Sequence, residues 1–150
     1  METISGTLSS DHRRCDELFA RAEEHIANRQ WDAGAPAFGE FMGAMEQHFS
    51  MEEQVLFPSF EERTGQQFGP TQVMRMEHAQ MRQLLREMAA SVAERDRDAY
   101  LGQSETLLML MQQHNAKEEQ VLYRMADQVL ATSVPEVLAR MRTTSAGRQD

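Results

Sequence analysis

Residues 47–57 have the sequence QHFSMEEQVLF, and residues 113–123 repeat it, 66 positions later, as QHNAKEEQVLY. Both copies contain a histidine followed four residues later by a glutamate: His48 and Glu52 in the first copy, His114 and Glu118 in the second. On an α-helix, residues four apart lie on the same face, about 6 Å apart along the axis. The repeat therefore predicts two helices, each with an imidazole and a carboxylate pointing in the same direction.

Two more histidines obey the same repeat. His12 and His78 are 66 residues apart, and each lies 36 residues before the histidine of its own copy. Each also follows an acid, Asp11 or Glu77. An acid near the start of a helix is favoured by the helix dipole, which accounts for Asp11. Four of the five histidines thus belong to two copies of one pattern, which predicts a site with twofold pseudosymmetry.

The combination of imidazole nitrogen and carboxylate oxygen suits iron, manganese or zinc, and differs from the all-oxygen sets that calcium and magnesium prefer. A single His-x-x-x-Glu is compatible with a surface helix pair that contributes a few tenths of a kcal/mol. Its duplication, with a matched upstream histidine each time, favours a metal site instead. The alternative is a metal-free bundle in which the histidines and glutamates hydrogen-bond to one another.

Four imidazoles and two carboxylates exceed the needs of one tetrahedral zinc and suit two metals of octahedral type. If both glutamates bridge, each metal receives two nitrogens and two carboxylate oxygens. A bridging oxo or hydroxo group adds a fifth donor and leaves one position for an exogenous molecule. An open position on a redox metal predicts chemistry with O₂, NO or peroxide.

The composition is that of an ordinary globular protein, with 41% hydrophobic and 26% charged residues. We expect 150 residues to form a single domain (residues 1–150), with its core in residues 9–130 and a tail in residues 131–150. A net charge of −9 argues against a nucleic-acid partner. No apolar run approaches the ~18 residues of a membrane span, and the N-terminus lacks the features of a secretory signal. A single cysteine excludes an intrachain disulfide. We therefore expect a cytoplasmic monomer or homodimer with no membrane partner.

The hydrophobic periodicity predicts four long amphipathic helices and no strands. Expected boundaries are a first helix capped by Ser9, Ser10 or Asp11 and ending near Asn28, a second with Pro36 in its first turn and its end marked by Pro58 and Gly65, a third starting at Pro70, and a fourth capped by Asp96 or Asp98. Short connections predict an all-α, up-down-up-down four-helix bundle, followed by a short helix over residues 136–142 and a frayed tail from residue 143. All six repeated side chains fall on inward-facing stripes, as do Val121 and Met125.

With these motifs, the chain resembles the hemerythrin-like, or HHE cation-binding, family over residues 9–130, nearly its whole length. The resemblance implies a four-helix bundle that holds a non-haem di-iron centre, and it favours iron over manganese and zinc. The implied ligands are His12, His48 and Glu52 from the first half, and His78, His114 and Glu118 from the second.

The sequence departs from the oxygen-carrying members of that family. Those members have a fifth histidine ligand four residues from the third-helix histidine, whereas Met74 and Arg82 flank His78 at that spacing. Their last carboxylate is an aspartate five residues after its histidine, whereas Glu118 follows at four. The set is more similar to bacterial proteins that repair iron–sulfur centres, to peroxide-consuming relatives and to iron- and oxygen-sensing modules. Two functions stay open: an oxidoreductase directed at peroxide or NO in stress response or iron homeostasis, and a non-catalytic iron or oxygen sensor acting through a partner.

Five other residues have chemistry that could contribute. His25 has no partner in the repeat and is expected to be a solvated helix histidine. Cys15 is expected to act as a small core hydrophobe, and Tyr123, which matches a phenylalanine in the first copy, to serve packing. Glu53 and Glu119 follow the repeated glutamates and are expected either to face solvent or to support the ligands from behind.

Overall fold

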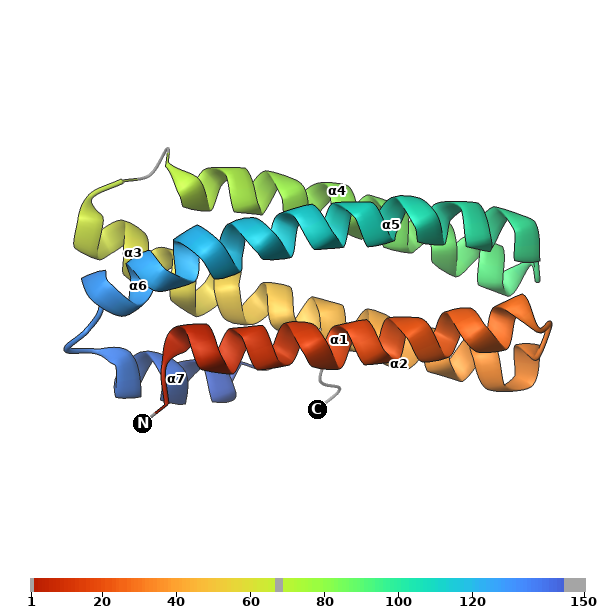
Figure 1. Cartoon of the computed structure of the whole chain (residues 1–150), viewed down its shortest axis with the longest axis horizontal. Coiled ribbons are helices and arrows are strands. Elements are labelled where there is room, and N and C mark those ends of the chain that lie inside the picture. The colour runs from red at the N-terminus through yellow and green to blue at the C-terminus, as the bar shows by residue number, and fades with distance from the viewer. Residues whose placement is uncertain (1, 67–68, 145–150) are drawn as a thin grey trace.

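The computed structural model of the chain describes residues 2–66 and 69–144. Four long helical rods run antiparallel to one another and pack side by side (Figure 1). The elements are α1 (Ile4–Ala27), α2 (Trp31–Met51), η1 (Glu52–Leu56), α3 (Phe57–Thr64), α4 (Pro70–Ala93), α5 (Arg97–Lys117), η2 (Glu118–Leu122), α6 (Tyr123–Val129) and α7 (Val134–Arg142). Because η1 and η2 are π-helical turns, α2, η1 and α3 form one rod without a break, and α5, η2 and α6 form another. The predicted all-α four-helix bundle with a short C-terminal helix is confirmed.

The first helix begins about two turns earlier than predicted. Thr3 caps α1 by accepting a hydrogen bond from the backbone N–H of Gly6 at 2.9 Å. The carboxylate of Asp127 accepts from the N–H groups of Ile4 and Ser5. These acceptors satisfy N–H groups that a helix start otherwise leaves without partners. A cap at Ser9, Ser10 or Asp11 was therefore a wrong prediction.

The two prolines of the second rod act differently from the prediction, whereas Gly65 ends the rod as predicted. Pro36 lies inside α2, which begins at Trp31, so its placement in the first turn was wrong. Pro58 does not end the rod, because it follows the π-helical turn η1 as the second residue of α3, where a proline is tolerated. The rod ends at Gly65, whose φ of 72° is a left-handed conformation that favours glycine.

The starts of the third and fourth rods agree with the prediction. Pro70 is the first residue of α4. Asp96 caps α5, because its side chain accepts a hydrogen bond from the N–H of Ala99 at 3.1 Å.

Two apolar clusters fill the bundle, and a polar layer separates them. One cluster extends from Cys15 toward the α1–α2 and α4–α5 connections, and the other includes Leu8 and the residues around α3, α6 and α7. His12 lies on α1 between Cys15, which belongs to the first cluster, and Leu8, which belongs to the second. The other repeated side chains likewise lie between the two clusters on their own helices. The fold thus places all six in one layer with apolar core on both sides.

The last helix closes the end of the bundle at which the first half begins. In Figure 1, α7 lies beside the start of α1, and it contacts η1, where Val55 is only 5% exposed. Val121, the counterpart of Val55, is 51% exposed, because no second copy of α7 covers it within the described residues. Its prediction as an inward residue was therefore wrong, whereas Met125 is half-buried against the core.

The chain after α7 is not frayed at its first residues. Thr144 is buried, and its carbonyl accepts a hydrogen bond from Gln47 Nε2 at 2.9 Å. The predicted frayed tail is wrong at this residue, and residues 145–150 of that prediction lie outside the described part.

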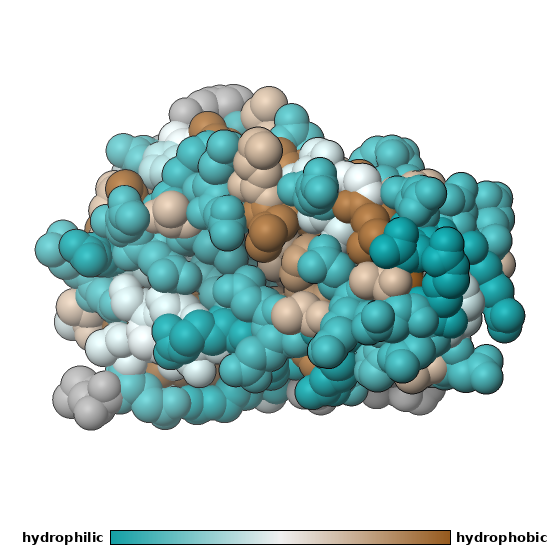
Figure 2. Space-filling model, turned by 45° about the vertical axis from the view of Figure 1, so that its right-hand side comes forward, coloured by the Kyte–Doolittle hydropathy of each residue, from teal (hydrophilic) through white to brown (hydrophobic). Residues whose placement is uncertain are grey.

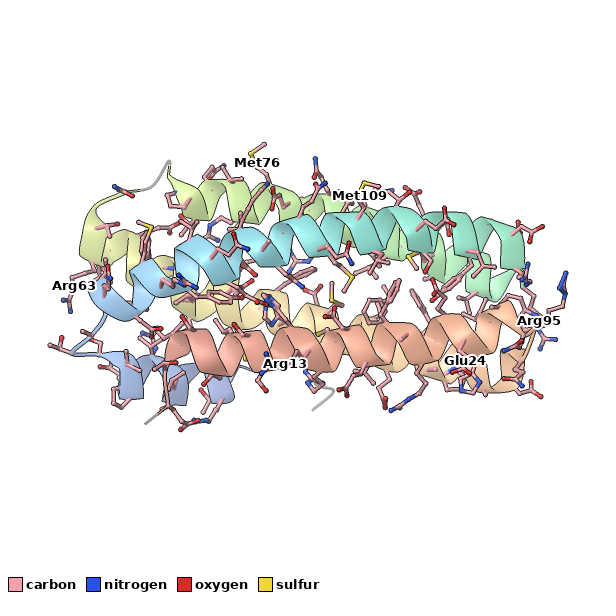
Figure 3. The ribbon with its side chains drawn as sticks, in the orientation of Figure 1. Arg13, Glu24, Arg63, Met76, Arg95 and Met109 are labelled. Carbon is pink, nitrogen blue, oxygen red and sulfur yellow. The ribbon has the colours of Figure 1, made fainter. Side chains whose placement is uncertain are left out.

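The surface is mostly hydrophilic, with hydrophobic residues gathered in the upper middle of the face shown in Figure 2. Met76 and Met109 project outward from α4 and α5 (Figure 3). The large apolar residues that the described surface exposes are Val73, Met76, Leu108, Met109 and Val121, all from the second half of the chain. In residues 2–66 and 69–144, no helix has the length and apolarity needed to cross a membrane.

Candidate metal centre

The six side chains of the repeat converge in the polar layer. Each of the four rods contributes: His12 from α1, His48 and Glu52 from α2 and η1, His78 from α4, and His114 and Glu118 from α5 and η2. None is more than 4% exposed. Ionisable groups buried to this extent are costly unless they are paired or bind a cation.

Their donor atoms form two clusters. In the first, one atom from each of Glu52, His78, His114 and Glu118 lies within 4.8 Å of every other. In the second, His12, His48 and Glu118 meet the same criterion. Because Glu118 belongs to both clusters, the arrangement is consistent with a binuclear metal site.

Every histidine of the site has a carboxylate behind it. The Nδ1 atoms lie at hydrogen-bond distance from four acids: His12 from Glu119 (2.6 Å), His48 from Asp11 (2.8 Å), His78 from Glu53 (2.7 Å) and His114 from Glu77 (2.8 Å). A carboxylate accepts, so each Nδ1 carries the proton, which leaves Nε2 to face the centre. This is the orientation that metal-binding histidines usually have in proteins.

These bonds decide between the expectations for the four acids. Glu53 and Glu119 support the ligands from behind, which was one of the two alternatives. The explanation of Asp11 by the start of a helix was wrong, because α1 begins at Ile4 and Asp11 binds His48 instead.

Cations hold three of these acids in their charged form. Arg82 donates to both oxygens of Glu53 (2.8 and 2.9 Å), Lys117 donates to Glu77, and Arg14 to Asp11. Burial raises the pKa of Glu53, but the hydrogen bonds from His78 and Arg82 outweigh burial and lower it to about 2. The acid behind His78 is therefore a carboxylate throughout the physiological pH range.

Several atoms at the centre lack a hydrogen-bond partner among the described residues. They are Glu52 Oε1, Glu118 Oε2, His78 Nε2 and His114 Nε2, all buried. His78 Nε2 lies 3.0 Å from Glu52 Oε1 without making a hydrogen bond. Buried polar atoms without a partner are rare and costly. The donor types and their missing partners fit metal ions, which would satisfy all four atoms at once.

The electrostatics of the layer attracts positive charge. Burial alone lowers the pKa of His48, but the charge of Glu52 and the hydrogen bond to Asp11 raise it well above its usual value. Burial alone likewise lowers the pKa of His78, but the nearby carboxylates of Glu52 and Glu53 outweigh burial and raise it to about 9. Without a metal, protons occupy the place of a cation, so metal binding must displace them.

Tyr123 belongs to the site, and the prediction that it serves packing alone was wrong. Its hydroxyl donates to Glu52 Oε2 at 2.6 Å and lies 2.8 Å from Glu118 Oε1. It also lies 3.1 Å from His12 Nε2 and 3.3 Å from His48 Nε2. Burial and the charges of both glutamates raise its pKa well above 10. The π-helical turn explains the missed position, because i→i+5 hydrogen bonding brings the residue five after Glu118 back over the site.

The side of the layer around His78 is more apolar than the side around Tyr123. Phe57 stands where the repeat would place a second tyrosine, and its ring stacks on His78 with 5.6 Å between centroids. Phe49 stacks on the same imidazole at 4.2 Å. The pseudosymmetric site thus has one polar side, near Tyr123, and one apolar side, near His78.

Cys15 and His25 lie outside the site, as predicted. Cys15 is 2% exposed within the apolar cluster, and burial raises the pKa of its thiol to about 11, which makes it a poor nucleophile. His25 Nδ1 lies 2.9 Å from Gln30 Oε1 near the C-terminal end of α1.

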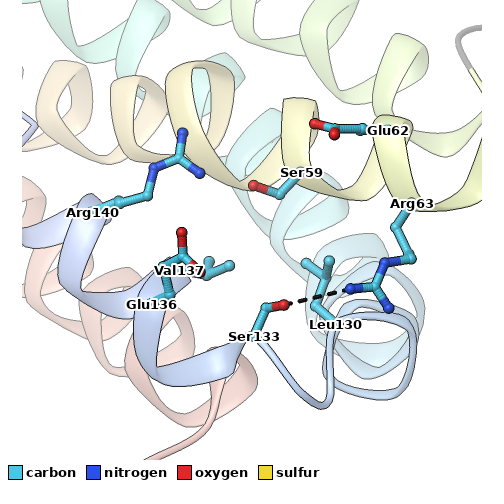
Figure 4. Close-up of a pocket in the computed structure, with 8 residues that line it drawn as sticks. All are labelled: Ser59, Glu62, Arg63, Leu130, Ser133, Glu136, Val137 and Arg140. Atoms are coloured by element: carbon cyan, nitrogen blue, oxygen red, sulfur yellow. Dashed lines mark hydrogen bonds between the residues drawn. The ribbon is translucent and has the colours of Figure 1, made fainter.

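One crevice in the surface borders a histidine of the centre, His114. It has a volume of about 80 Å³, lies between α4 and α5, and is lined by Glu77, Gln80, Met81, Leu110, Gln113 and His114. The equivalent surface of the first half includes Ala44 and Gln47; Ala44 is buried, and Thr144 binds Gln47. A larger hollow of about 320 Å³ at the end of the bundle, between α3 and α7 and partly bounded by Arg63 and Arg140, contains none of the six side chains (Figure 4).

A four-helix bundle with a buried layer of imidazoles and carboxylates defines a class of helical, cation-binding proteins. Within this class, residues 3–126 match the family model described as the hemerythrin HHE cation binding domain, and the chain belongs to this family. Comparisons with curated proteins and with solved structures gave no match.

Proposed function

We propose that this chain is a non-haem di-iron protein that binds or reduces O₂, NO or peroxide in stress response or iron homeostasis. His12, His48, Glu52, His78, His114 and Glu118, which form the two clusters, would hold the two irons. The observation that carries the proposal is the pair of buried clusters sharing Glu118, with donor atoms that no described residue satisfies.

The composition of the centre excludes some metals, and the family favours iron among those that remain. Magnesium and calcium prefer oxygen donors, whereas four of the six donors here are imidazole nitrogens. A structural zinc site has four ligands and no open position. When bound in this layer, a redox metal with an open position supplies electrons to a small molecule.

The chain itself orients the donors and excludes bulk water. The four outer carboxylates hold the imidazoles in place, and apolar clusters cover the layer on both sides. The crevice beside His114, at about 80 Å³, admits a molecule of two or three heavy atoms, since one water occupies roughly 30 Å³ in the liquid. We assign this crevice as the access route for the small molecule.

Anaerobic reconstitution with ferrous iron, followed by oxidation in air, tests the proposal. We expect about two irons per chain, near-ultraviolet charge-transfer bands from an oxo bridge, and peroxide disproportionation that is lost in Glu52→Ala. Tightly held zinc in a colourless protein, with iron that fails to replace it, would contradict a di-iron function.

A second function is favoured by a specific observation. Val73, Met76, Leu108, Met109 and Val121 expose apolar surface on α4, α5 and η2, and such surface is typical of a contact site for another protein. A non-catalytic iron or oxygen sensor would fold or stiffen on metal binding and present this face to a partner. Metal-dependent stabilisation without peroxide turnover distinguishes the sensor from the enzyme.

A further inference from the structure

Tyr123 is where the repeat around the metal layer is broken. The six repeated side chains, and the four carboxylates behind the histidines, have a counterpart 66 residues away in the sequence. The counterpart of Tyr123 in the first copy is Phe57, whose ring has no atom that could bind a metal. One half of the layer therefore has an oxygen that the other half lacks.

The hydroxyl oxygen of Tyr123 lies about as far from four donor atoms of the site as two ligands of one metal lie from each other. It lies 2.6 Å from Glu52 Oε2, 2.8 Å from Glu118 Oε1, 3.1 Å from His12 Nε2 and 3.3 Å from His48 Nε2. Two donors at right angles on one metal stand roughly 3 Å apart, given bonds of about 2.1 Å. The oxygen therefore has the spacing of an adjacent corner relative to all four.

Two of three distances among the other donors agree with the same polyhedron, whereas His48 Nε2 and Glu52 Oε2, at 3.5 Å, stand between the two spacings. His12 Nε2 and Glu118 Oε1 are 3.0 Å apart, the spacing of adjacent corners. His48 Nε2 and Glu118 Oε1 are 3.9 Å apart, close to the roughly 4.2 Å that separates opposite corners. His12, His48 and Glu118 thus approximate three corners of one octahedron, and the tyrosine oxygen lies beside all three, whereas Glu52 lies outside the cluster that these three residues form.

The alternative is that Tyr123 only donates hydrogen bonds. Its two short bonds go to the glutamates, but a lone hydroxyl proton can serve one acceptor well. In the metal-free protein, protonated imidazoles can donate to the hydroxyl oxygen, so hydrogen bonds account for each contact singly, whereas a shared cation accounts for all four contacts together.

We propose that Tyr123 is a seventh protein ligand, whose phenolate oxygen binds the metal held by His12 and His48. On metal binding the O–H bond breaks, the proton leaves to solvent, an oxygen–metal bond forms, and no electron is transferred. The inference rests on the two-metal site of the proposed function and not on the identity of the metal.

Zinc titration of the metal-free protein tests this inference without iron or turnover. Tyrosinate absorbs in the near ultraviolet at longer wavelength than tyrosine, and the chain has only two tyrosines. The other, Tyr100, lies in the apolar cluster around Cys15. We expect one tyrosinate per chain in the wild type and none in Tyr123→Phe, with two zinc ions bound in both.

The matched variant is Phe57→Tyr, which restores the repeat. We expect it to form a second tyrosinate per chain when zinc binds. In the ferric protein we expect a visible phenolate-to-iron charge-transfer band that Tyr123→Phe abolishes.

The outcomes separate the two proposals. Two bound zinc ions without a tyrosinate signal, or an equal signal in wild type and Tyr123→Phe, would overturn the inference and leave the metal centre standing. A tyrosinate signal with zinc but no iron binding would support the inference and refute the di-iron function. If Tyr123→Phe failed to fold, the wild-type titration would still decide.

Discussion

Replacing Glu53 with glutamine probes the outer carboxylates most directly. The Glu53 carboxylate accepts from His78 Nδ1 at 2.7 Å and from two nitrogens of Arg82 at 2.8 and 2.9 Å. An amide keeps the shape and can still accept one hydrogen bond, so Glu53→Gln removes mainly the negative charge. The substitution therefore isolates the electrostatic contribution of this side chain.

The pKa of Glu53 gives the magnitude. A fall from 4.5 to about 2 corresponds to an upper limit of about 3 kcal/mol of stability. The side chain is 21% exposed, and solvent screening reduces this figure, so we expect a loss of about 2 kcal/mol in the metal-free protein. Loss of a carboxylate behind a metal-binding histidine typically weakens metal affinity about 10- to 100-fold.

Two measurements and one control variant check this reasoning. Urea denaturation of the metal-free protein gives the stability, and competition with a chromophoric chelator gives the metal affinity. Glu119→Gln is the control, because Glu119 holds His12 at 2.6 Å but is 39% exposed. We expect it to weaken metal binding similarly and to cost less stability. Unchanged metal affinity in Glu53→Gln would refute the proposed role of the outer carboxylates.

Three further outcomes are expected. The raised pKa of His78, about 9, contributes stability that is present below pH 6.5 and lost as pH rises through 9, so the metal-free protein should weaken over this window while metal affinity increases; denaturation at several pH values, with and without metal, checks both trends. Gln113→Trp should obstruct the crevice and slow the association of NO with the reduced protein at least tenfold in stopped-flow experiments, whereas Met109→Trp, at a 60% exposed position, should not; equal rates would exclude this route. Glu118→Ala should reduce bound metal below one ion per chain by elemental analysis, because both clusters share this residue, and His25→Ala should leave two.

The six side chains of the centre could be predicted because the information is local and duplicated. Spacings of four residues fix the face of a helix, and the offset of 66 residues identifies equivalent positions without any knowledge of packing. The bundle follows from the same stripes. Where Pro70 and Asp96 start their helices, the signal is equally local.

Features that depend on contacts between distant segments could not be predicted. Asp127 fixes the start of α1 from the far end of the chain, and α7 decides whether a valine of the repeat is buried, as Val55 is, or exposed, as Val121 is. Tyr123 was missed for a different reason. A period of 3.6 residues places it away from Glu118, and the π-helical turn that brings it back has no known signature in the residues EEQVL.

The outer carboxylates also have a consequence for how the two halves of the molecule depend on each other. Glu53 from the first half holds His78 of the second, and Glu119 from the second half holds His12 of the first. Neither half therefore contains every group that its own imidazoles need, although each carries a complete copy of the motif. If the first half separated from the second, His12 and His78 would each lose the carboxylate that binds its Nδ1. We therefore expect the two halves to unfold together rather than one after the other.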